Sequence, residues 1–380
     1  MKEFKVKEIR KNSFFTKTAF LDQNFIVLTP EMPFTEDISS SLEKWSFNSI
    51  YSDGEPQSQY TGSNTDSGAY VGGPIDLSQQ PDSGNLGKAE EYYSNLLFYI
   101  ENVFVKASVS DELDFKSIME KIREMVEFIR DNRRELLMVL SNTEPLTGKN
   151  YTATHSIRTA IYSIIVGTYI KLPQHRLIEL GVAALVHELG MLKLPSSVYL
   201  KERLLSPQEQ KAVMTHPILG YTLLKSHNFP LTICLAALEH HERENAGGYP
   251  RRLTSDKINL YSKIVAVACS YEALITKRPH KEAKDGHTAM LELLKNEDKQ
   301  YDDIIIRAFA NSISIYPIGL YVLLSNEKKG QVIDVTPENP KNPIVQIFGE
   351  FNPDGKNKTV QIVPGALTIV RPLKKSEIEN

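Results

Sequence analysis

The chain has 380 residues, 41% of them hydrophobic and 24% charged, which suits an ordinary globular protein with two or three domains. Its formal net charge of -3 argues against non-specific nucleic-acid binding, which normally needs a basic excess, so DNA is not an expected partner. Two cysteines give no disulfide framework, and no apolar run reaches the ~18 residues that a membrane-spanning helix needs. We therefore expect a soluble cytoplasmic protein without membrane insertion.

Residues 1–52 are predicted to form a small α/β module. Apolar runs in AFLDQNFIVL suit a hairpin with its turn at residues 22–24, and FTEDISSSLEKWSF then places apolar side chains at helical spacing. Nothing in this segment is typical of catalysis. Two interpretations stay open: a sensory module that binds a signalling protein, and a structural appendage.

The composition changes after this module. Residues 53–88 are rich in Ser, Gly, Asp, Gln and Pro, and they are predicted to be a flexible linker because they bury too little apolar surface to offset their ordering entropy. Residues 89–148 show an apolar period near 3.6 and are predicted to form two long helices.

The remaining chain divides into a helical and a β-type part. Residues 149–325 keep helical periodicity, and SPQEQKAVMTHPILGYTLLKS opens with a capping box made by Ser206 and Glu209. After about Ala310 the period changes, and runs such as YPIGLYVLLS, GQVIDVTP and KTVQIVPG between turn sequences are β-type; residues 326–380 are predicted to form a β extension. The predicted fold is mainly α, a helical bundle with the small N-terminal α/β unit and a C-terminal antiparallel β extension that serves as a lid or structural cap.

Five of the nine histidines carry the strongest functional signal. The stretch HHERENAGGYP pairs His240 with His241 before a Gly-Gly-Tyr-Pro turn, and three more precede it, His155, His187 and His216. A lone histidine on an apolar helix is usually a satisfied core residue. Because neutral imidazole is the commonest side-chain metal ligand, a set of five instead indicates a metal site.

The segment ALVHELG adds a carboxylate to this set. Glu188 follows His187 in an apolar context, where an unpaired carboxylate would be costly to bury and a cation would satisfy both residues. Imidazole and carboxylate ligands without multiple cysteines suit Fe, Mn, Ni or Zn rather than a structural zinc cluster. More than four ligands imply two metals, which can orient a hydroxide for in-line attack on phosphorus.

Over about residues 149–325, the ordered motifs resemble those of the HD-GYP branch of the HD-domain phosphohydrolases. NYTATHSIRTA is similar to the family's first-histidine helix, ALVHELGMLKLP to its HD signature, and HHERENAGGYP to its HHE…GYP element. THPILG supplies a further histidine, and VAVACSYEALITKRPHKEA is similar to the helix that carries a last metal ligand and an Arg-Pro-Tyr-Arg stretch. Members are bacterial cyclic-di-GMP phosphodiesterases with a helical HD-domain bundle and two or three metals.

The resemblance implies roles for individual residues. Two divalent metal ions, Fe or Mn, would be held by His155, His187, Glu188, His216, His240, His241 and Cys269. His187 and Glu188 would be the catalytic pair. Tyr249 would shape the substrate loop, and Arg278 and Lys281 would contact phosphate or guanine of cyclic-di-GMP.

The sequence departs from the family pattern at several positions. Glu188 replaces the usual aspartate, Met191 a lysine expected to hold phosphate, and Cys269 the last aspartate ligand. Further replacements are Asn245 and Ala246 for Asp-Gly, and His280 for the tyrosine of the Arg-Pro-Tyr-Arg stretch. Because three-metal members carry glutamate where this chain has Tyr151, we expect two metals.

These features support two functions from different classes. The first is a cyclic-di-GMP phosphodiesterase that forms pGpG, with GMP as a further product, by two-metal-activated hydroxide. The second is a catalytically impaired protein that binds cyclic-di-GMP or a signalling partner. Retention of the five histidines favours the first, and the changes at Met191 and Cys269 favour the second. A third interpretation, an HD-type phosphohydrolase for another nucleotide, is disfavoured by the Gly-Tyr-Pro turn.

Single positions keep simpler alternatives. Cys269 on its apolar helix also suits an inert buried thiol. Arg278 and Lys281 also suit solvated charges that follow the end of a helix.

Overall fold

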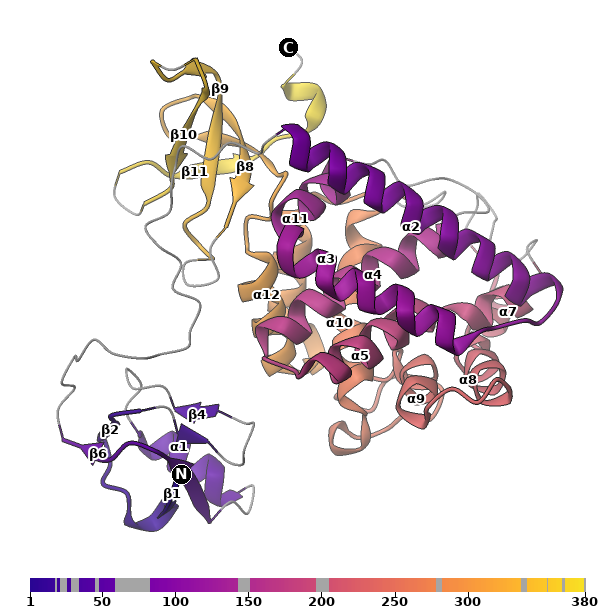
Figure 1. Ribbon diagram of the computed structural model, residues 1–380, viewed down its shortest axis with the longest axis horizontal. Helices are drawn as coiled ribbons and strands as arrows, with labels where there is room; N and C mark the ends of the chain where they lie inside the picture. Colours follow the sequence, from indigo (N-terminus) through magenta and orange to yellow (C-terminus); the bar gives the residue numbers. More distant parts are fainter. Residues whose placement is uncertain are drawn as a thin grey trace. The chain divides into compact units, whose positions relative to one another are not determined.

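The computed structural model describes residues 1–17, 19–20, 26–28, 34–44, 48–58, 83–142, 151–195, 205–277, 282–335, 340–353, 355–363 and 366–378. The chain forms two compact units, Met1–Ile75 and Asp76–Asn380 (Figure 1). Arg278, His280 and Lys281 lie outside the described residues, as does the predicted turn at residues 22–24.

The N-terminal unit has the predicted α/β character. Its four-stranded antiparallel sheet has the order β1-β5-β3-β4, with β1 at Lys2–Lys5, β3 at Ala19–Phe20, β4 at Ile26–Leu28 and β5 at Ser49–Ser52. A second pair joins β2 (Phe14–Phe15) to β6 (Pro56–Gln57), and the helix α1 spans Glu36–Lys44. The buried side chains include Val6, Phe15, Phe34, Leu42 and Ile50. A sheet partner at β6 means that ordered structure continues into the segment predicted to be linker.

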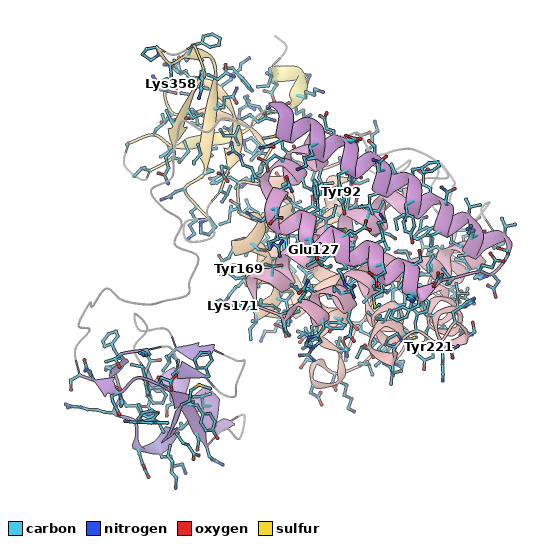
Figure 2. The ribbon with its side chains drawn as sticks, viewed as in Figure 1. Tyr92, Glu127, Tyr169, Lys171, Tyr221 and Lys358 are labelled. Carbon is cyan, nitrogen blue, oxygen red and sulfur yellow. The ribbon has the colours of Figure 1, made fainter. Side chains whose placement is uncertain are left out.

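The larger unit begins with the two predicted long helices, α2 (Ser83–Val109) and α3 (Phe115–Asn142). Helix α2 starts six residues before the predicted boundary because Leu86 and Ala89 already contact the core. Figure 1 shows α2 and α3 side by side. Tyr92, labelled in Figure 2, stacks on Phe128 across this contact with ring centroids 3.7 Å apart.

The centre of the unit is an all-helical core. Helix α4 (Tyr151–Tyr169) is buried from Thr152 to Gly167 and contacts α2, α3, α5, α10 and α12. The others are α5 (Gln174–Val186), α7 (Pro207–Val213), α8 (His216–Ser226), α9 (Leu231–Glu239), α10 (Leu260–Ile275), α11 (Gly286–Lys295) and α12 (Asp303–Ile313). The mainly helical fold predicted from the sequence is confirmed. No helix in the described part of the chain has the length and apolar character needed to cross a bilayer.

One predicted helix is divided in two. Ser206 caps α7 as predicted: its Oγ accepts from the backbone N–H of Glu209 at 3.3 Å, and Oε2 of Glu209 accepts from the backbone N–H of Ser206 at 2.8 Å. The chain then breaks at Met214–Thr215, and α8 begins at His216. Pro217 suits only the first turn of a helix because it has no N–H to donate. The break therefore places His216 at a helix start.

The C-terminal sheet is antiparallel with strand order β10-β9-β8-β7-β11. Its strands are β7 (Tyr321–Leu324), β8 (Lys329–Asp334), β9 (Ile344–Phe351), β10 (Asn357–Gln361) and β11 (Ile369–Pro372). Its first strand, β7, lies within the predicted β-type run YPIGLYVLLS, five residues before the predicted domain boundary at 326, and Val322 and Leu324 alternate into the core. Arg134 of α3 attaches the sheet to the helices: its Nε donates to the carbonyl of Ile333 at 3.0 Å.

Short 3-10 helices complete the unit, and the one after α5 fixes a close contact. It is η2 (Leu189–Lys193); the others in the described chain are η1 (Val6–Glu8), η3 (Ser255–Lys257), η4 (Glu297–Lys299) and η5 (Lys375–Glu377). A Cβ on Gly190 would overlap the carbonyl oxygen of His216 and lie 2.5 Å from the backbone N of Gly220. Only glycine lets η2 approach the start of α8 this closely.

Replacing Gly190 by alanine is therefore expected to destabilise the larger unit by ~1–3 kcal/mol, the usual range for overpacking. Gly87→Ala in α2 is the matched control, because its added Cβ would meet no atom within 4 Å. That control should be neutral or raise stability by up to ~1 kcal/mol, as alanine favours a helix. Urea unfolding of the two variants measures both effects, and equal midpoints would contradict the close contact.

Candidate metal centre

The structure brings all seven predicted ligands together. Two of them lie within helices and five lie at helix ends. The ligands are His155 in α4, Cys269 in α10, His187 and Glu188 after the end of α5, His216 at the start of α8, and His240 and His241 after the end of α9. His155, His187, His216 and His240 are no more than 3% exposed, whereas Glu188 is 14% exposed. The centre is buried, with Glu188 and His241 partly exposed.

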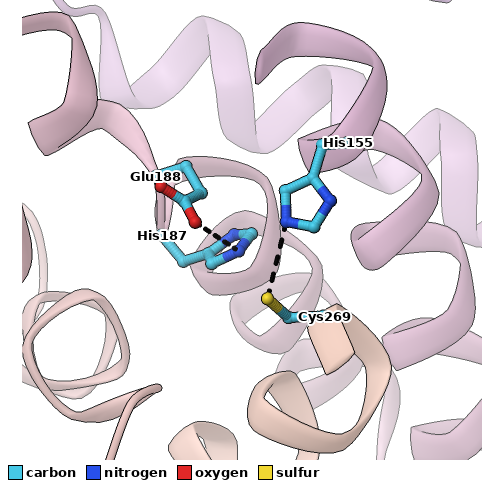
Figure 3. A group of neighbouring side chains, drawn as sticks. All are labelled: His155, His187, Glu188 and Cys269. Atoms are coloured by element: carbon cyan, nitrogen blue, oxygen red, sulfur yellow. Dashed lines mark hydrogen bonds and ion pairs between the residues drawn. The ribbon is translucent and has the colours of Figure 1, made fainter. Parts of the chain in front are cut away.

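The seven side chains form two groups that share Glu188. The first group is His155, His187, Glu188 and Cys269, drawn in Figure 3, and the second is Glu188, His216, His240 and His241. Within each group, one ligand atom per residue lies within 4.8 Å of all the others. A carboxylate has two oxygens, so Glu188 can serve both groups at once.

Three imidazoles are oriented in the same way. The Nδ1 atoms of His187, His216 and His240 donate to the carbonyl oxygen three residues earlier, at 2.7, 2.7 and 2.9 Å. Because a carbonyl oxygen can only accept, each Nδ1 carries the proton and each Nε2 keeps its lone pair. The local backbone at these helix ends thus fixes the tautomer that binds a metal.

These lone pairs have no donor to satisfy them. Nε2 of His187 is buried without a hydrogen-bond partner among the described residues. Nε2 of His216 and Nε2 of His240 face each other at 3.1 Å, although both are acceptors. Oε2 of Glu188 lies 3.6 Å from Nε2 of His216, and its Oε1 lies 4.0 Å from Nε2 of His187. Acceptor atoms that face one another in a buried space repel each other. Divalent cations would bind these lone pairs and the negative charge, and would thereby remove the repulsion.

His155 is oriented by a side chain that the sequence analysis did not single out. Its Nε2 lies 3.5 Å from Sγ of Cys269, and its Nδ1 donates to Glu272, which is fully buried. Glu272 also accepts from the hydroxyl of Thr276 and lies 3.9 Å from Nη1 of Arg158. A carboxylate behind a histidine ligand fixes the ring and raises its basicity. The available signal was a glutamate one turn after Cys269 in an otherwise apolar helix.

The acidic groups of the centre are held in their charged forms. Burial raises the pKa of Glu188, but the nearby imidazoles of His216 and His187 outweigh it and bring the pKa to about 2. Burial likewise raises the pKa of Cys269, but the charge and hydrogen bond of His155, with a smaller contribution from the neighbouring His187, lower this pKa to about 6. Both residues are therefore anionic at neutral pH.

The histidines divide into two kinds. Burial first, and then neighbouring imidazoles, hold the pKa values of His240 and His241 well below the ordinary value, so these rings stay neutral. Burial also lowers the pKa of His155, but Glu272 and Cys269 raise it to about 10. His155 is therefore protonated on both ring nitrogens, between the anions Glu272 and Cys269. A metal ion that binds Nε2 would have to displace the proton there.

The Gly-Tyr-Pro loop covers one side of the centre. The ring of Tyr249 stacks on His241 with centroids 4.6 Å apart, and the Tyr249–Pro250 peptide bond is cis. Glu242 is not a ligand: its carboxylate accepts from the backbone N–H of Arg251 at 2.6 Å and of Leu253 at 2.9 Å. The glutamate of the HHE motif thus holds the loop in place.

Other changed positions are structural in this fold. The side chain of Asn245 donates to the carbonyl of Asp298 at 2.8 Å and accepts from the backbone N–H of Gly247 at 2.9 Å, which stabilises the turn before Tyr249. Met191 lies in η2 and is half-buried. It can supply no positive charge.

Comparison with known proteins identifies the domain that contains this centre. Residues 136–305 match the protein family described as HD domain. This segment contains all seven candidate ligands. The predicted resemblance to HD-domain proteins is thereby confirmed.

Two curated relatives match parts of this chain. Cyclic di-GMP phosphodiesterase PdeB of Borreliella burgdorferi is 30% identical over 239 residues, which cover 62% of this chain and 63% of the relative. A cyclic di-GMP phosphodiesterase of Thermotoga maritima is 35% identical over 133 residues, covering 34% of this chain and 36% of the relative. The chain thus spans less than two thirds of the length of each.

A solved structure shows the same fold. It is described as an HDG"Y"P protein from Bdellovibrio bacteriovorus and has a TM-score of 0.50 and 16% identity. The match covers 81% of this chain and 97% of that chain, so it includes elements beyond the HD domain.

Glu272→Gln tests the orienting role of Glu272. The amide keeps the size of the side chain but loses the charge that faces Nδ1 of His155, so Mn²⁺ affinity should fall about 10- to 100-fold. Glu179→Gln is the matched control, because Glu179 accepts from the hydroxyl of Tyr261 and belongs to neither ligand group. Titration of Mn²⁺ against a fluorescent chelator measures the affinities. Equal affinities in the two variants would contradict the role.

Proposed function

We propose that this protein is a metal-dependent phosphodiesterase that hydrolyses cyclic-di-GMP to pGpG. The observation that carries the proposal is the pair of ligand groups that share Glu188 beneath the Tyr249 loop. The match of residues 136–305 to the HD-domain family supports it, as do the names of the two curated relatives.

The donor set suggests which metals are used. Imidazole nitrogens, a carboxylate and one thiolate suit Fe or Mn, with two ions held by the two groups. Two such ions would supply Lewis-acid stabilisation of the phosphoryl oxygens and lower the pKa of the attacking water.

The chain's own residues have defined tasks in this proposal. Glu188 holds the two groups at a fixed separation, and the bonds to backbone carbonyls prevent the imidazoles from rotating. The stacked ring of Tyr249 offers an aromatic surface against which a guanine or ribose can lie. Arg278 and Lys281 remain predicted phosphate or guanine contacts, and a signalling protein remains a predicted partner of the N-terminal unit.

A second candidate is a protein that binds cyclic-di-GMP without hydrolysing it. Met191 supplies no cation to the phosphate, and Sγ of Cys269 is a softer ligand than the aspartate oxygen expected there. Both changes would slow hydrolysis more than binding, since a metal centre can form with a thiolate. The charge lost at Met191 is not supplied by Lys193, the cation at the end of η2, because Lys193 pairs with Asp111.

Turnover of cyclic-di-GMP by protein purified without oxygen tests the proposal, with products separated by chromatography. We expect pGpG to accumulate in the wild type and turnover to fall at least about 100-fold in His187→Ala, because an unpartnered ligand nitrogen is removed. His175→Ala on the exposed start of α5 is the matched control and should keep full activity.

The alternatives give different results in the same assay. Bound cyclic-di-GMP and bound metal without product would support the second candidate. Full activity in His187→Ala would contradict a role for these groups in catalysis.

A further inference from the structure

A cavity of about 480 Å³ lies between the helical core and the C-terminal extension. It is bounded by the end of α3, by α4 and α10, by the start of α11 and by residues 317–321 and 373–375. None of the seven candidate ligands lines it. Its volume falls within the range of ~300–1,000 Å³ that small-molecule sites occupy.

The inner wall of the cavity is buried and largely apolar. Tyr162 and Tyr271 meet edge to face there, with centroids 5.3 Å apart and an interplanar angle of 88°. Leu137 and Ile313 add aliphatic surface. The two tyrosine rings offer an apolar surface, and their hydroxyl groups offer hydrogen bonds.

The mouth of the cavity is cationic. Lys277, Lys374 and Lys375 are exposed around it, and Lys284 is half-buried. Lys277 pairs with Glu282 at 3.4 Å and Lys284 pairs with Glu292. Lys374 and Lys375 belong to the C-terminal segment, whereas Lys277 and Lys284 belong to the helical part. Both parts of the unit therefore contribute positive charge to the mouth.

The lining contains one carboxylate, and that group is already engaged. Oδ1 of Asp285 accepts from the backbone N–H of Thr288 at 2.9 Å, and its Oδ2 accepts from the Thr288 hydroxyl at 2.7 Å, so it caps α11. The electrostatic balance of the lining therefore favours an anion.

We propose that this cavity binds a small organic anion that carries a ring. The ring would lie against Tyr162 and Tyr271, and the acidic group would pair with Lys374 and Lys375 at the mouth. Burial of the ring and charge-assisted hydrogen bonds at the rim would together supply the affinity.

The cavity also has a direct connection to the metal centre. Arg158 is buried in its wall, and Nη1 of Arg158 lies 3.9 Å from Oε1 of Glu272. Glu272 in turn accepts from Nδ1 of His155. An anion held at the mouth adds negative charge to the cavity that Arg158 lines and so changes the charge balance around Arg158 and Glu272. The anion is therefore an effector of metal binding, and the metal is reciprocally an effector of the anion.

The probe for the test is 8-anilinonaphthalene-1-sulfonate, an aromatic anion whose fluorescence rises in apolar surroundings. We expect one saturable site per chain in the full-length protein. The double charge reversal Lys374→Glu with Lys375→Glu should weaken binding about tenfold, as the loss of two exposed ion pairs predicts. Lys88→Glu with Lys116→Glu, at exposed positions of α2 and α3 outside the cavity, is the charge-matched control and should bind like the wild type.

A second variant tests the location independently of charge. Ala283→Trp places a large side chain at an exposed position of the mouth and should block the probe without altering the fold. The uncharged analogue N-phenyl-1-naphthylamine should bind more weakly than the sulfonate to the wild type. Unchanged sulfonate binding in both variants, or equal binding of the two probes, would overturn the proposed site.

Mn²⁺ titration with and without saturating sulfonate tests the effector role. We expect the Mn²⁺ dissociation constant to change at least about threefold, near the lower end of typical coupling between sites. The Ala283→Trp variant should lose this change but keep its Mn²⁺ affinity. An unchanged dissociation constant in the wild type would overturn the effector role.

Discussion

The candidate centre depends on one electrostatic constraint, the convergence of buried lone pairs around a single carboxylate. Nε2 atoms of His187, His216 and His240 point inward because their Nδ1 protons are bound to backbone carbonyls, and Glu188 lies between the two groups. Without cations this arrangement is unfavourable, since acceptors face acceptors in a buried space. The packed helices therefore hold a group of buried acceptors that bound divalent ions would stabilise.

The packing of the surrounding helices places the ligand side chains so that their lone pairs converge. The ligands cluster at helix ends, where a histidine side chain reaches the carbonyl three residues earlier while its ring leaves the helix. Gly190 lets η2 touch the start of α8, which brings Glu188 to His216. Glu272 behind His155 and Glu242 behind the Tyr249 loop are buried carboxylates that orient rather than bind.

The sequence predicted the fold class, both long helices and the capping box at Ser206, because these depend on local periodicity and short-range hydrogen bonds. It placed element ends less well. The break before His216 follows from Pro217, a local signal that apolar periodicity does not show, and the early start of α2 depends on tertiary contacts. Glu272 was missed for the same reason, since its partner His155 lies 117 residues away in the chain. The sharing of Glu188 between two groups likewise required the three-dimensional arrangement.

The central claim, that the two ligand groups sharing Glu188 would each hold a divalent ion, is tested most directly by anomalous diffraction. Crystals of protein purified without oxygen would be measured at the iron and manganese absorption edges. The account predicts two peaks within the candidate centre, one beside His155, His187 and Cys269 and the other beside His216, His240 and His241, with Glu188 contacting both. A single peak that does not contact Glu188, or no peak in metal-replete crystals, would contradict it.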